Sequence, residues 1–187
     1  KQFGPQALIE VAHKMGITSD LPAVPSICLG TADVSVYEMV GAYSAFANKG
    51  VWTEPSYITH IEDKNGNILQ EFVPRKVEAI SEETAYLMLN LMQGVVQFGT
   101  GARLRGQYKF NNPIAGKTGT TQNQSDGWFM GITPELVSGC WVGAEDRSVH
   151  FRTLELGQGA RTAMPIWALY MQKIYADKTL DISKGDF

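Results

Sequence analysis

Residues 112–121 read Asn-Pro-Ile-Ala-Gly-Lys-Thr-Gly-Thr-Thr, and this stretch decides the fold of the chain. A short apolar approach leads into a Lys-Thr-Gly-Thr run, and a polar turn follows. Two more strand-like stretches come next, at 127–133 and 136–145. A cation, two hydroxyls and a bare glycine backbone on one strand make a binding edge that suits an anionic, acyl-bearing substrate. We therefore interpret the rest of the chain as the frame around this edge.

Two other interpretations of the Lys-Thr-Gly run compete with a binding edge. Gly116, Lys117 and Thr118 also match the end of a phosphate-binding P-loop, but that loop requires a glycine where this chain has Asn111. It also requires a helix directly after Lys-Thr, whereas this sequence continues into a turn and a strand. An ordinary edge strand with a lysine in water is the default for an isolated Lys-Thr-Gly, so the surrounding sequence must decide.

Length and composition indicate one globular domain. The chain has 187 residues, of which 44% are hydrophobic and 19% are charged, and its formal net charge is -3. This balance gives no reason to expect nucleic acid as a partner. No apolar run approaches the roughly 20 residues that a membrane span needs. The chain opens on Lys1 without a signal peptide, so we expect it to be a piece of a longer protein.

The two cysteines and the histidines predict no metal chemistry. Cys28 and Cys140 lie far apart in the sequence among apolar neighbours, which predicts buried free thiols rather than a disulfide. No His or Cys has the spacing of metal ligands. We therefore expect neither a metal nor another cofactor.

Four amphipathic segments predict helices. The first spans 6–15 and the last about 161–175, while the second begins with a capping box at Ser35 and the third begins at Ser81. The side chains predicted to be buried are Tyr37, Tyr43 and Phe46 on the second helix, Leu87, Met88, Leu91, Met92 and Val95 on the third, and Met164, Ile166, Trp167, Tyr170, Met171 and Ile174 on the last.

An Asn-Gly turn within 63–67 joins two short strand-like runs, 57–62 and 68–73, into a hairpin. A ribbon of two strands is only marginally stable alone. We therefore expect this ribbon to lie on the main body of the protein.

The glycine-rich segment 99–105 predicts a mobile loop before the Lys-Thr-Gly-Thr strand. It carries Arg103 and Arg105, and Lys109 follows closely. These cations fit either a solvated loop or a basic rim of the binding site, and the sequence favours neither.

The Lys-Thr-Gly-Thr strand and the two stretches after it predict an antiparallel meander. Its bulk would come from Trp128, Phe129, Cys140, Trp141 and Val142. The predicted fold class is thus α+β, an antiparallel sheet flanked by helices.

Several sequence blocks, in order along the chain, form the pattern of a known family. They occupy 34–50, 92–101, 115–121, 126–134, 142–143 and 157–167. In this order the blocks resemble the C-terminal part of the transpeptidase domain of class A, bifunctional penicillin-binding proteins. The resemblance covers nearly all of residues 1–187. It implies that residues 1–187 are part of a single domain with the penicillin-binding and serine β-lactamase-like fold. The complete sheet of that fold has five strands.

The family's nucleophile has no match in this chain. Its chemistry requires a Ser followed three residues later by Lys, then a Ser-x-Asn, then the Lys-Thr-Gly strand. No Ser here has Lys three residues on or Asn two residues on. We expect the nucleophile and two sheet strands to come from upstream sequence. The polypeptide alone should then show an exposed strand or an exposed apolar face, or another chain should cover that surface.

The resemblance assigns roles along the central strand. Lys117 would supply positive potential, and the backbone N–H of Thr120 would be an oxyanion donor, a group worth about 2.7–4 kcal/mol in related chemistry. The hydroxyls of Thr118 and Thr120 would hold the terminal carboxylate of D-Ala-D-Ala or of a β-lactam. Gly119 would let the substrate lie against the strand edge as an added strand.

We expect no catalytic role for four further side chains. Arg103 and Arg105 match no family motif, so they remain candidates for a rim. Asp126 and Trp128 fit the family pattern, and we predict a turn acceptor and a core residue respectively.

The implied function is a peptidoglycan D,D-transpeptidase, inhibited by β-lactams, that cross-links stem peptides through a serine acyl-enzyme. Its partners would be stem peptides, a lipid-linked precursor and the upstream half of the same domain. A glycosyltransferase domain and a membrane anchor would lie elsewhere in the parent, at the outer face of the bacterial cytoplasmic membrane. The piece alone would be inactive.

Two rival functions remain. One is a D,D-carboxypeptidase or serine β-lactamase of the same superfamily, although the helices flanking Lys117 favour the biosynthetic type. The other is a non-catalytic penicillin-binding-like module that serves as a sensor or scaffold. A Ser-x-x-Lys in the parent protein would argue against this second rival.

Overall fold

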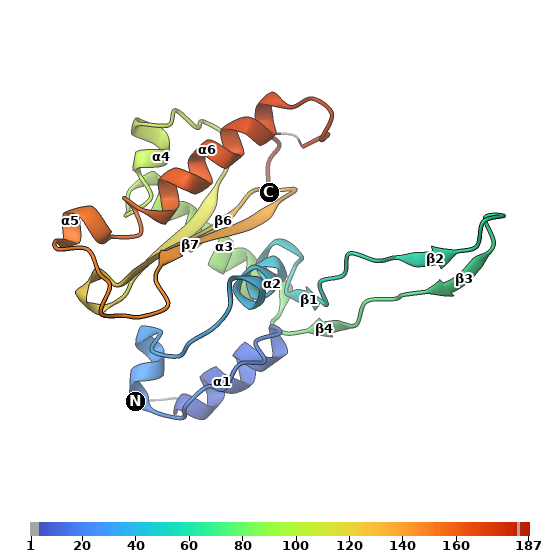
Figure 1. Cartoon of the computed structure of the whole chain (residues 1–187), viewed down its shortest axis with the longest axis horizontal. Helices are drawn as coiled ribbons and strands as arrows, with labels where there is room; N and C mark the ends of the chain where they lie inside the picture. The colour runs from blue at the N-terminus through green and yellow to red at the C-terminus, as the bar shows by residue number, and fades with distance from the viewer. Residues whose placement is uncertain (1–3, 183) are drawn as a thin grey trace.

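The computed structural model describes residues 4–182 and 184–187, and its centre is an antiparallel sheet with strand order β5-β6-β7 (Figure 1). The strands are β5 (Ala115–Thr120), β6 (Asp126–Ile132) and β7 (Val137–Gly143). In the register of the first pair, Lys117 lies opposite Met130. This confirms the predicted meander and the α+β class, and it places the Lys-Thr-Gly-Thr run on an edge strand.

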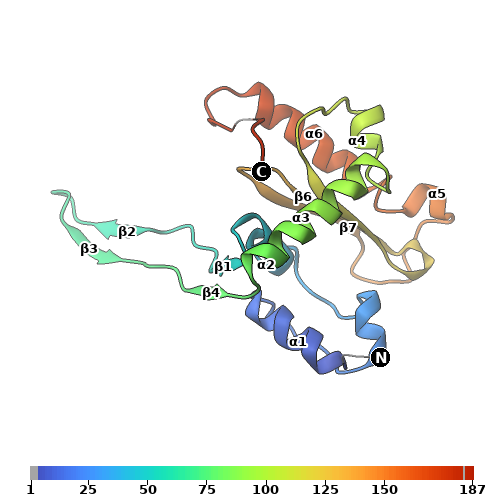
Figure 2. The same cartoon turned by 180° about the vertical axis from the view of Figure 1, so that it is seen from behind.

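Helices cover both faces of the sheet (Figures 1 and 2). α6 (Ala163–Ala176) lies on one face, and α2 (Val36–Ala47) and α3 (Glu82–Gln97) lie on the other. On the α6 side, the rings of Phe129 and Trp167 meet edge to face with centroids 5.1 Å apart. Both side chains are buried, so this contact anchors the main core.

The predicted helices form where their capping residues stand. Ser35 and Glu38 complete a capping box, in which Glu38 donates its backbone N–H to the Ser35 hydroxyl at 3.1 Å and the Ser35 N–H donates to the Glu38 carboxylate at 2.9 Å. The Ser81 hydroxyl accepts the backbone N–H of Thr84 at the start of α3. The remaining helical elements are α1 (Pro5–Lys14), η1 (Pro25–Leu29), α4 (Arg103–Gly106), η2 (Gln122–Gln124) and α5 (Leu154–Gly157).

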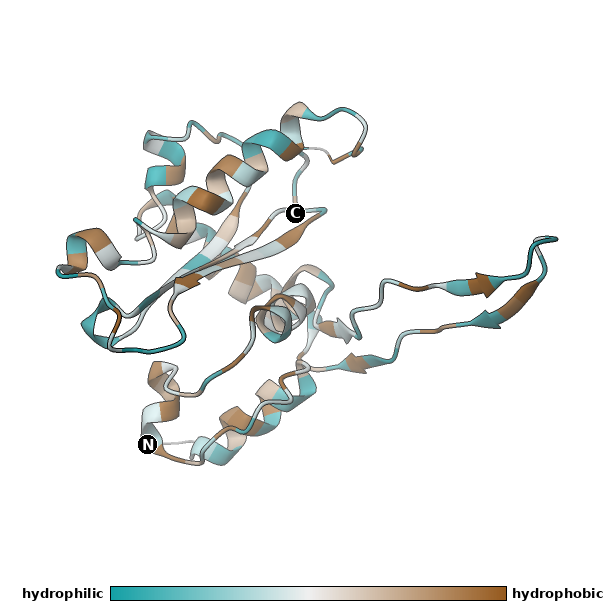
Figure 3. Ribbon diagram, viewed as in Figure 1, coloured by the Kyte–Doolittle hydropathy of each residue, from teal (hydrophilic) through white to brown (hydrophobic). Residues whose placement is uncertain are grey.

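The predicted buried faces of α3 and α6 are partly wrong. On α3 the buried residues are Ala85, Leu89, Met92 and Val96, while Leu87 and Leu91 are 62% and 66% exposed. On α6, Ile166 and Tyr170 are exposed as well, and apolar colour is visible on this helix in Figure 3. Both helices are apolar on more than one side. The side that packs on the sheet carries Leu89 and Met92 on α3, and Met164, Trp167 and Met171 on α6. The outer face of α3 is the kind of exposed apolar face that we expect of part of a domain.

The ribbon does not lie on the main body, so that prediction is wrong. β2 (His60–Glu62) and β3 (Ile68–Glu71) pair with each other, are exposed along their length, and project far from the sheet (Figures 1 and 2). At the ribbon's base, β1 (Val51–Thr53) pairs with β4 (Lys76–Glu78), which the sequence did not predict. The Asn-Gly turn is confirmed, because Gly66 adopts a φ of +83° there.

Two single-residue predictions of burial are also wrong. Cys28 is exposed on η1, although it is a free thiol as predicted, and Cys140 is a half-buried free thiol on β7. Tyr37 is 60% exposed rather than in the core, and its hydroxyl donates to the Pro55 carbonyl at 3.2 Å.

Within the described residues, no helix combines the length and the apolar character that crossing a bilayer demands.

Candidate active site

The side chains of β5 alternate between the two faces of the sheet. Ala115 belongs to a buried cluster with Leu89 and Met92 of α3, so Lys117 and Gly119, two and four residues on, lie on the α3 side. Gly116, Thr118 and Thr120 lie on the α6 side. Because the strand runs through these residues without a break, the Lys-Thr-Gly is not the loop-to-helix junction of a P-loop.

One edge of β5 pairs with β6, and no other strand among residues 4–182 and 184–187 pairs with its opposite edge. Thr121 donates its N–H inward to the Asp126 carbonyl at 3.2 Å. In an antiparallel pair, successive residues direct their backbone groups alternately toward the partner strand and away from it. Thr118 and Thr120 therefore direct N–H and C=O to the open side, where an extended peptide could pair with them.

Lys117 folds over this open edge. Its side chain is exposed, and Nζ donates to the Thr118 carbonyl at 2.7 Å. The ammonium group thus lies beside the backbone groups to which an acyl substrate would bind. This single contact is with a backbone carbonyl, which a competing partner can displace.

Both strand hydroxyls have partners outside the sheet. The Thr118 hydroxyl lies 2.7 Å from the hydroxyl of Thr100, in the turn between α3 and α4. The Thr120 hydroxyl accepts the backbone N–H of Gly159 at 3.0 Å, in the turn before α6. Sequence reasoning missed Thr100 and Gly159, because each lies far from the strand in the chain and only the fold brings them to it.

The structure gives a second reason for a glycine at position 119, which the sequence did not reveal. A Cβ built on it would lie 3.1 Å from the Cβ of Trp128, its cross-strand partner. The absence of a side chain therefore lets the Trp128 ring pack across the strand, in addition to leaving room at the edge. Trp128 is half-buried rather than in the core, and its ring lies 6.5 Å from that of Trp141.

The two arginines lie in a short helix, α4, where a mobile loop was predicted. Arg103 donates from Nη1 to the Ala160 carbonyl at 3.1 Å. Arg105 donates from Nη1 to the carbonyls of Phe110 and Asn112, at 3.0 and 2.6 Å. Both guanidinium groups thus hold backbone turns and do not extend freely into water, and a role at the rim of the site stays a prediction.

Asp126 does not act as the predicted turn acceptor through Oδ1. That oxygen is buried and has no hydrogen-bond partner among the described residues. The turn after β5 is closed instead by Thr121, whose hydroxyl accepts the Asp126 N–H at 3.0 Å and lies 3.0 Å from the Ser125 hydroxyl.

No complete catalytic centre is visible within the described residues. Their serine hydroxyls form no hydrogen bond to a His or a Lys, and no group of three His, Cys, Asp or Glu side chains could hold a metal ion. Burial raises the pKa of the Cys140 thiol, which makes it a poor nucleophile. The β5 edge therefore offers binding groups and potential donors, and no described serine hydroxyl is paired with a basic side chain that would activate it.

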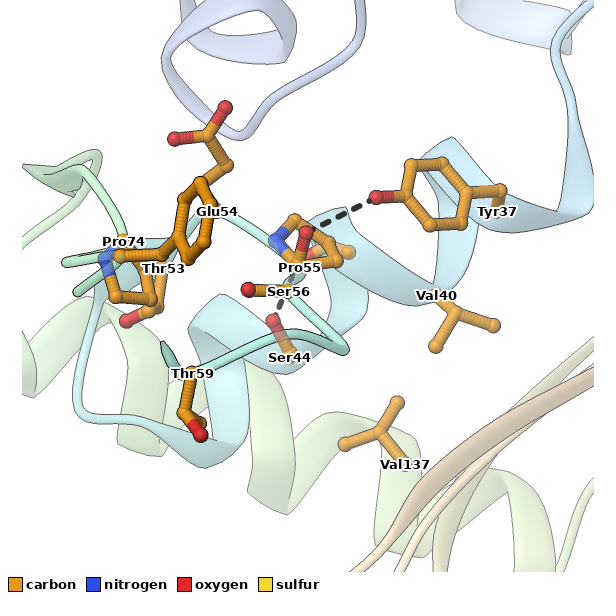
Figure 4. A pocket seen from close by; sticks show the side chains of 12 residues that line it. Tyr37, Val40, Ser44, Thr53, Glu54, Pro55, Ser56, Thr59, Pro74 and Val137 are labelled. Carbon is orange, nitrogen blue, oxygen red and sulfur yellow. Dashed lines mark hydrogen bonds between the residues drawn. The ribbon is translucent and has the colours of Figure 1, made fainter. Parts of the chain in front are cut away.

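A hollow of substantial volume lies away from this edge. It has a volume of about 520 Å³ and sits between α2 and the base of the ribbon, with Tyr37, Ser44, Thr59 and Val137 around it (Figure 4). Among its described lining residues Glu54 is the one carboxylate, and no Lys, His or Cys is present. This lining lacks a pair of groups for acyl transfer, so the β5 edge remains the candidate site.

Comparison with known proteins identifies the family of the chain. The sequence model of the penicillin binding protein transpeptidase domain matches residues 23–139. The chain belongs to the penicillin-binding protein transpeptidase family. The Lys-Thr-Gly-Thr strand lies within the matched region.

Relatives of this chain are named penicillin-binding proteins. Penicillin-binding protein 1A of Aquifex aeolicus is 34% identical over 173 residues, which cover 92% of this chain and 23% of the relative. The crystal structure of penicillin-binding protein 1A from Haemophilus influenzae covers 94% of this chain with a TM-score of 0.80 and 26% identity, over 31% of its own length. The PonA1 protein of Mycobacterium tuberculosis in complex with penicillin V covers 98% of this chain with a TM-score of 0.77 and 25% identity, over 52% of its length. These findings confirm the class A resemblance and the penicillin-binding fold.

Proposed function

We propose that residues 1–187 are the C-terminal part of the transpeptidase domain of a peptidoglycan D,D-transpeptidase. This enzyme would transfer an acyl group from D-Ala-D-Ala to an acceptor stem peptide through a serine acyl-enzyme, and β-lactams would inhibit it. The observation that carries the proposal is the open edge of β5, where Lys117 and the outward backbone of Thr118 and Thr120 lie together. Membership of the transpeptidase family supports it.

The edge can hold the donor peptide and its oxyanion. An extended peptide would pair with the outward N–H and C=O groups of β5 as an added strand. Attack by a serine converts the scissile carbonyl into a tetrahedral oxyanion, and the Thr120 N–H would donate to it. A positioned donor of this kind stabilises the transition state more than the ground state, so it raises the rate rather than only the affinity.

The two hydroxyls suit the terminal carboxylate of the donor. Thr118 and Thr120 are two residues apart on one face, so their Cβ atoms lie about 7 Å apart. A carboxylate that accepts one hydrogen bond at each oxygen spans about the same distance. Lys117 adds positive potential close by.

The nucleophile and the rest of the sheet would come from the upstream half of the domain. The exposed outer face of α3, with Leu87 and Leu91, and the free edge of β7 are surfaces that this half could cover. The chain spans 23% of the length of its Aquifex relative, so most of a protein of that length would lie outside it.

The family also suggests the setting of the whole protein. A glycosyltransferase domain and an N-terminal membrane anchor would precede the transpeptidase domain. The active site would then face stem peptides and lipid-linked precursor outside the bacterial cytoplasmic membrane.

The test is the intact mass of the full-length protein after treatment with benzylpenicillin, followed by peptide mapping of the adduct. We expect one penicilloyl group on a serine outside residues 1–187. The Lys117→Ala variant should acylate at least about 100-fold more slowly, the scale of a lost proton-transfer or electrostatic group. Lys173→Ala, on the far end of α6, is the matched control.

Two results would contradict the proposal. A full-length protein that forms no adduct would favour the non-catalytic module. An adduct on a residue within this chain would require a different nucleophile.

A further inference from the structure

The hydroxyls of Thr118 and Thr120 each form a hydrogen bond with a residue in a turn that packs against the sheet. The Thr118 hydroxyl is hydrogen-bonded to the Thr100 hydroxyl. The Thr120 hydroxyl accepts the backbone N–H of Gly159. Figures 1 and 2 show the two parts of the chain that carry these turns, near α4 and before α6, on the same side of the molecule. The contacts are between remote parts of the chain, so the fold itself sets where the hydroxyls stand.

The turn that carries Thr100 is tightly closed. Gly99 and Gly101 both donate their backbone N–H to the Val95 carbonyl, at 3.1 and 3.0 Å. A Cβ on Gly99 would lie 3.0 Å from that carbonyl oxygen, so a side chain would push the turn away from α3. The position of the Thr100 hydroxyl is therefore fixed to the end of α3.

The turn that carries Gly159 is in direct contact with the strands. A Cβ built on Gly159 would lie 2.3 Å from the Gly119 carbonyl oxygen and 2.4 Å from the Trp128 carbonyl oxygen. Only a residue without a side chain can come this close to the backbone of β5 and β6. This close approach fixes the position of the Gly159 N–H, which donates to the Thr120 hydroxyl.

Arg103 ties the two turns together. It follows Thr100 by three residues, and its Nη1 donates to the carbonyl of Ala160, the residue after Gly159. The same guanidinium donates from Nε and Nη2 to the side-chain oxygen of Gln107, at 3.1 and 2.6 Å, which holds its plane. We call Thr100, Arg103, Gly159 and Ala160 the bracket.

The bracket determines which protons are free. A hydroxyl has one proton and two lone pairs. Thr120 accepts from Gly159, so its own proton remains available to donate. When Thr100 donates to Thr118, the Thr118 proton is likewise available. Both hydroxyls can then donate to one anion, and hydrogen bonds to a charged acceptor are about twice as strong as neutral ones.

We propose that Thr100 and Arg103 are positioning residues that set the Thr118 and Thr120 hydroxyls as paired donors for the substrate carboxylate. This deepens the proposed function and rests on it. Thr100 orients one hydroxyl directly. Arg103 acts at one remove, because it fixes the Gly159 turn relative to the Thr100 turn.

The test compares two β-lactams that differ only in the carboxylate. The second-order rate constant of penicilloyl formation is measured on the full-length protein with benzylpenicillin and with its methyl ester. The ratio of the two constants reports how well the carboxylate is recognised in the transition state. Because both constants come from the same preparation, a loss of folded protein lowers both and cancels in the ratio.

The bracket variants should lower this ratio selectively. We expect Thr100→Val and Arg103→Met each to reduce it about 10-fold, the effect of roughly one hydrogen bond to a charged group. Thr100→Ser, which keeps the hydroxyl, should retain the wild-type ratio within about 2-fold. Arg161→Met is the matched control, because Arg161 follows Ala160 but pairs with Glu155 at 3.3 Å.

A double variant tests whether Thr100 acts through Thr118. Adding Thr100→Val to Thr118→Val should lower the ratio no further than Thr118→Val alone. An additional fall of the same size as in the wild-type background would overturn the coupling.

The outcomes separate this inference from the proposed function. A wild-type protein that forms no adduct rejects the proposed function, and the inference with it. The inference alone is rejected if the wild-type protein is acylated and the ratio stays the same in Thr100→Val and Arg103→Met. This covers variants that slow acylation by both compounds equally and variants that change neither rate.

Discussion

At the scale of single residues, glycines decide how closely the last helix approaches the sheet. A Cβ built on Gly131 of β6 would lie 2.3 Å from the ring of Trp167, which is 2% exposed. The indole also donates from Nε1 to the Ser138 hydroxyl on β7 at 2.8 Å. The ring therefore cannot move aside without losing a hydrogen bond in the core.

Gly131→Ala should consequently destabilise the folded protein by about 2–3 kcal/mol, the cost of overpacking a rigid core. The measurement is the thermal unfolding midpoint of the full-length protein. Gly106→Ala is the matched control, because a Cβ on Gly106 meets nothing within 4 Å. It should change stability by no more than about 0.5 kcal/mol. Equal midpoints for the two variants would show that Trp167 relocates easily.

Glu38 is a second residue with an effect beyond its own helix. Its carboxylate accepts the backbone N–H groups of Thr18 and Ser19, at 2.8 and 2.7 Å, and that of Ser35. Partial burial opposes ionisation, but the hydrogen bonds from Ser35, Ser19 and Thr18 outweigh it and hold the pKa of Glu38 well below its ordinary value of 4.5. This carboxylate joins the end of the α1 segment to the start of α2.

The lowered pKa gives the sign of a pH dependence. A carboxyl group whose pKa is lower in the folded state stabilises that state above its unfolded pKa, and the contribution disappears as the pH falls through the folded pKa. Glu38→Gln should therefore reduce stability by about 1 kcal/mol at pH 7, after allowance for solvent screening. The deficit should shrink steadily below about pH 4.5. Denaturant midpoints of wild type and variant from pH 3 to 7 provide the check, and a constant deficit would contradict it.

The residues of the site show what the sequence could and could not predict at this scale. Lys117, Thr118 and Thr120 were found because they are adjacent in the chain. Thr100 and Gly159 were missed, since their pairing with the strand depends on how two distant turns fold onto it. Arg103 was noticed as a cation, but its contact with the Ala160 carbonyl has no local signal.

At the scale of elements, caps and turns were predictable and orientations were not. The capping box of α2, the Ser81 cap of α3 and the Asn-Gly turn of the ribbon all formed where short-range chemistry places them. The ribbon's direction depends on whether an apolar surface exists to receive it. The buried face of α3 depends on which of two apolar stripes meets the sheet, and periodicity alone cannot choose between them.

The outer stripe of α3 gives a prediction about the whole domain. If the upstream half covers this face, Leu91→Asp should destabilise the full-length protein by about 2–4 kcal/mol, because a charge would be buried. Leu69→Asp, on the ribbon, is the matched control: the two leucines are 66% and 67% exposed in this chain. Thermal unfolding of both variants is the measurement. Equal, small effects would show that the α3 face is open to water in the full-length protein.

At the scale of the whole molecule, the central sheet has two edges that no other described strand pairs with, and we expect different partners for them. β5 and β7 are the outer strands of the sheet. The proposed domain would add strands at β7 and leave β5 open for substrate. The meander could be predicted from sequence because its strands are consecutive, whereas pairing with a remote segment leaves no pattern in residues 1–187.

Hydrogen exchange of the full-length protein can distinguish the two edges. The outward amides of β5, those of Thr118 and Thr120, should exchange quickly in the free protein and slow at least about 10-fold after acylation by penicillin. The outward amides of β7 should be protected in both states. Fast exchange along β7 in the free protein would indicate that no further strand is added there.

The tryptophans give this edge an optical signal. Of the four in the chain, Trp52 and Trp167 are buried, whereas Trp128 and Trp141 form a partly exposed pair, in which Trp128 is the cross-strand neighbour of Gly119. A peptide lying along β5 would shield Trp128 from water and shift its emission to shorter wavelength, while the buried pair would hardly respond. The arrival of a substrate could thus be followed in real time by the protein's own fluorescence, without any label.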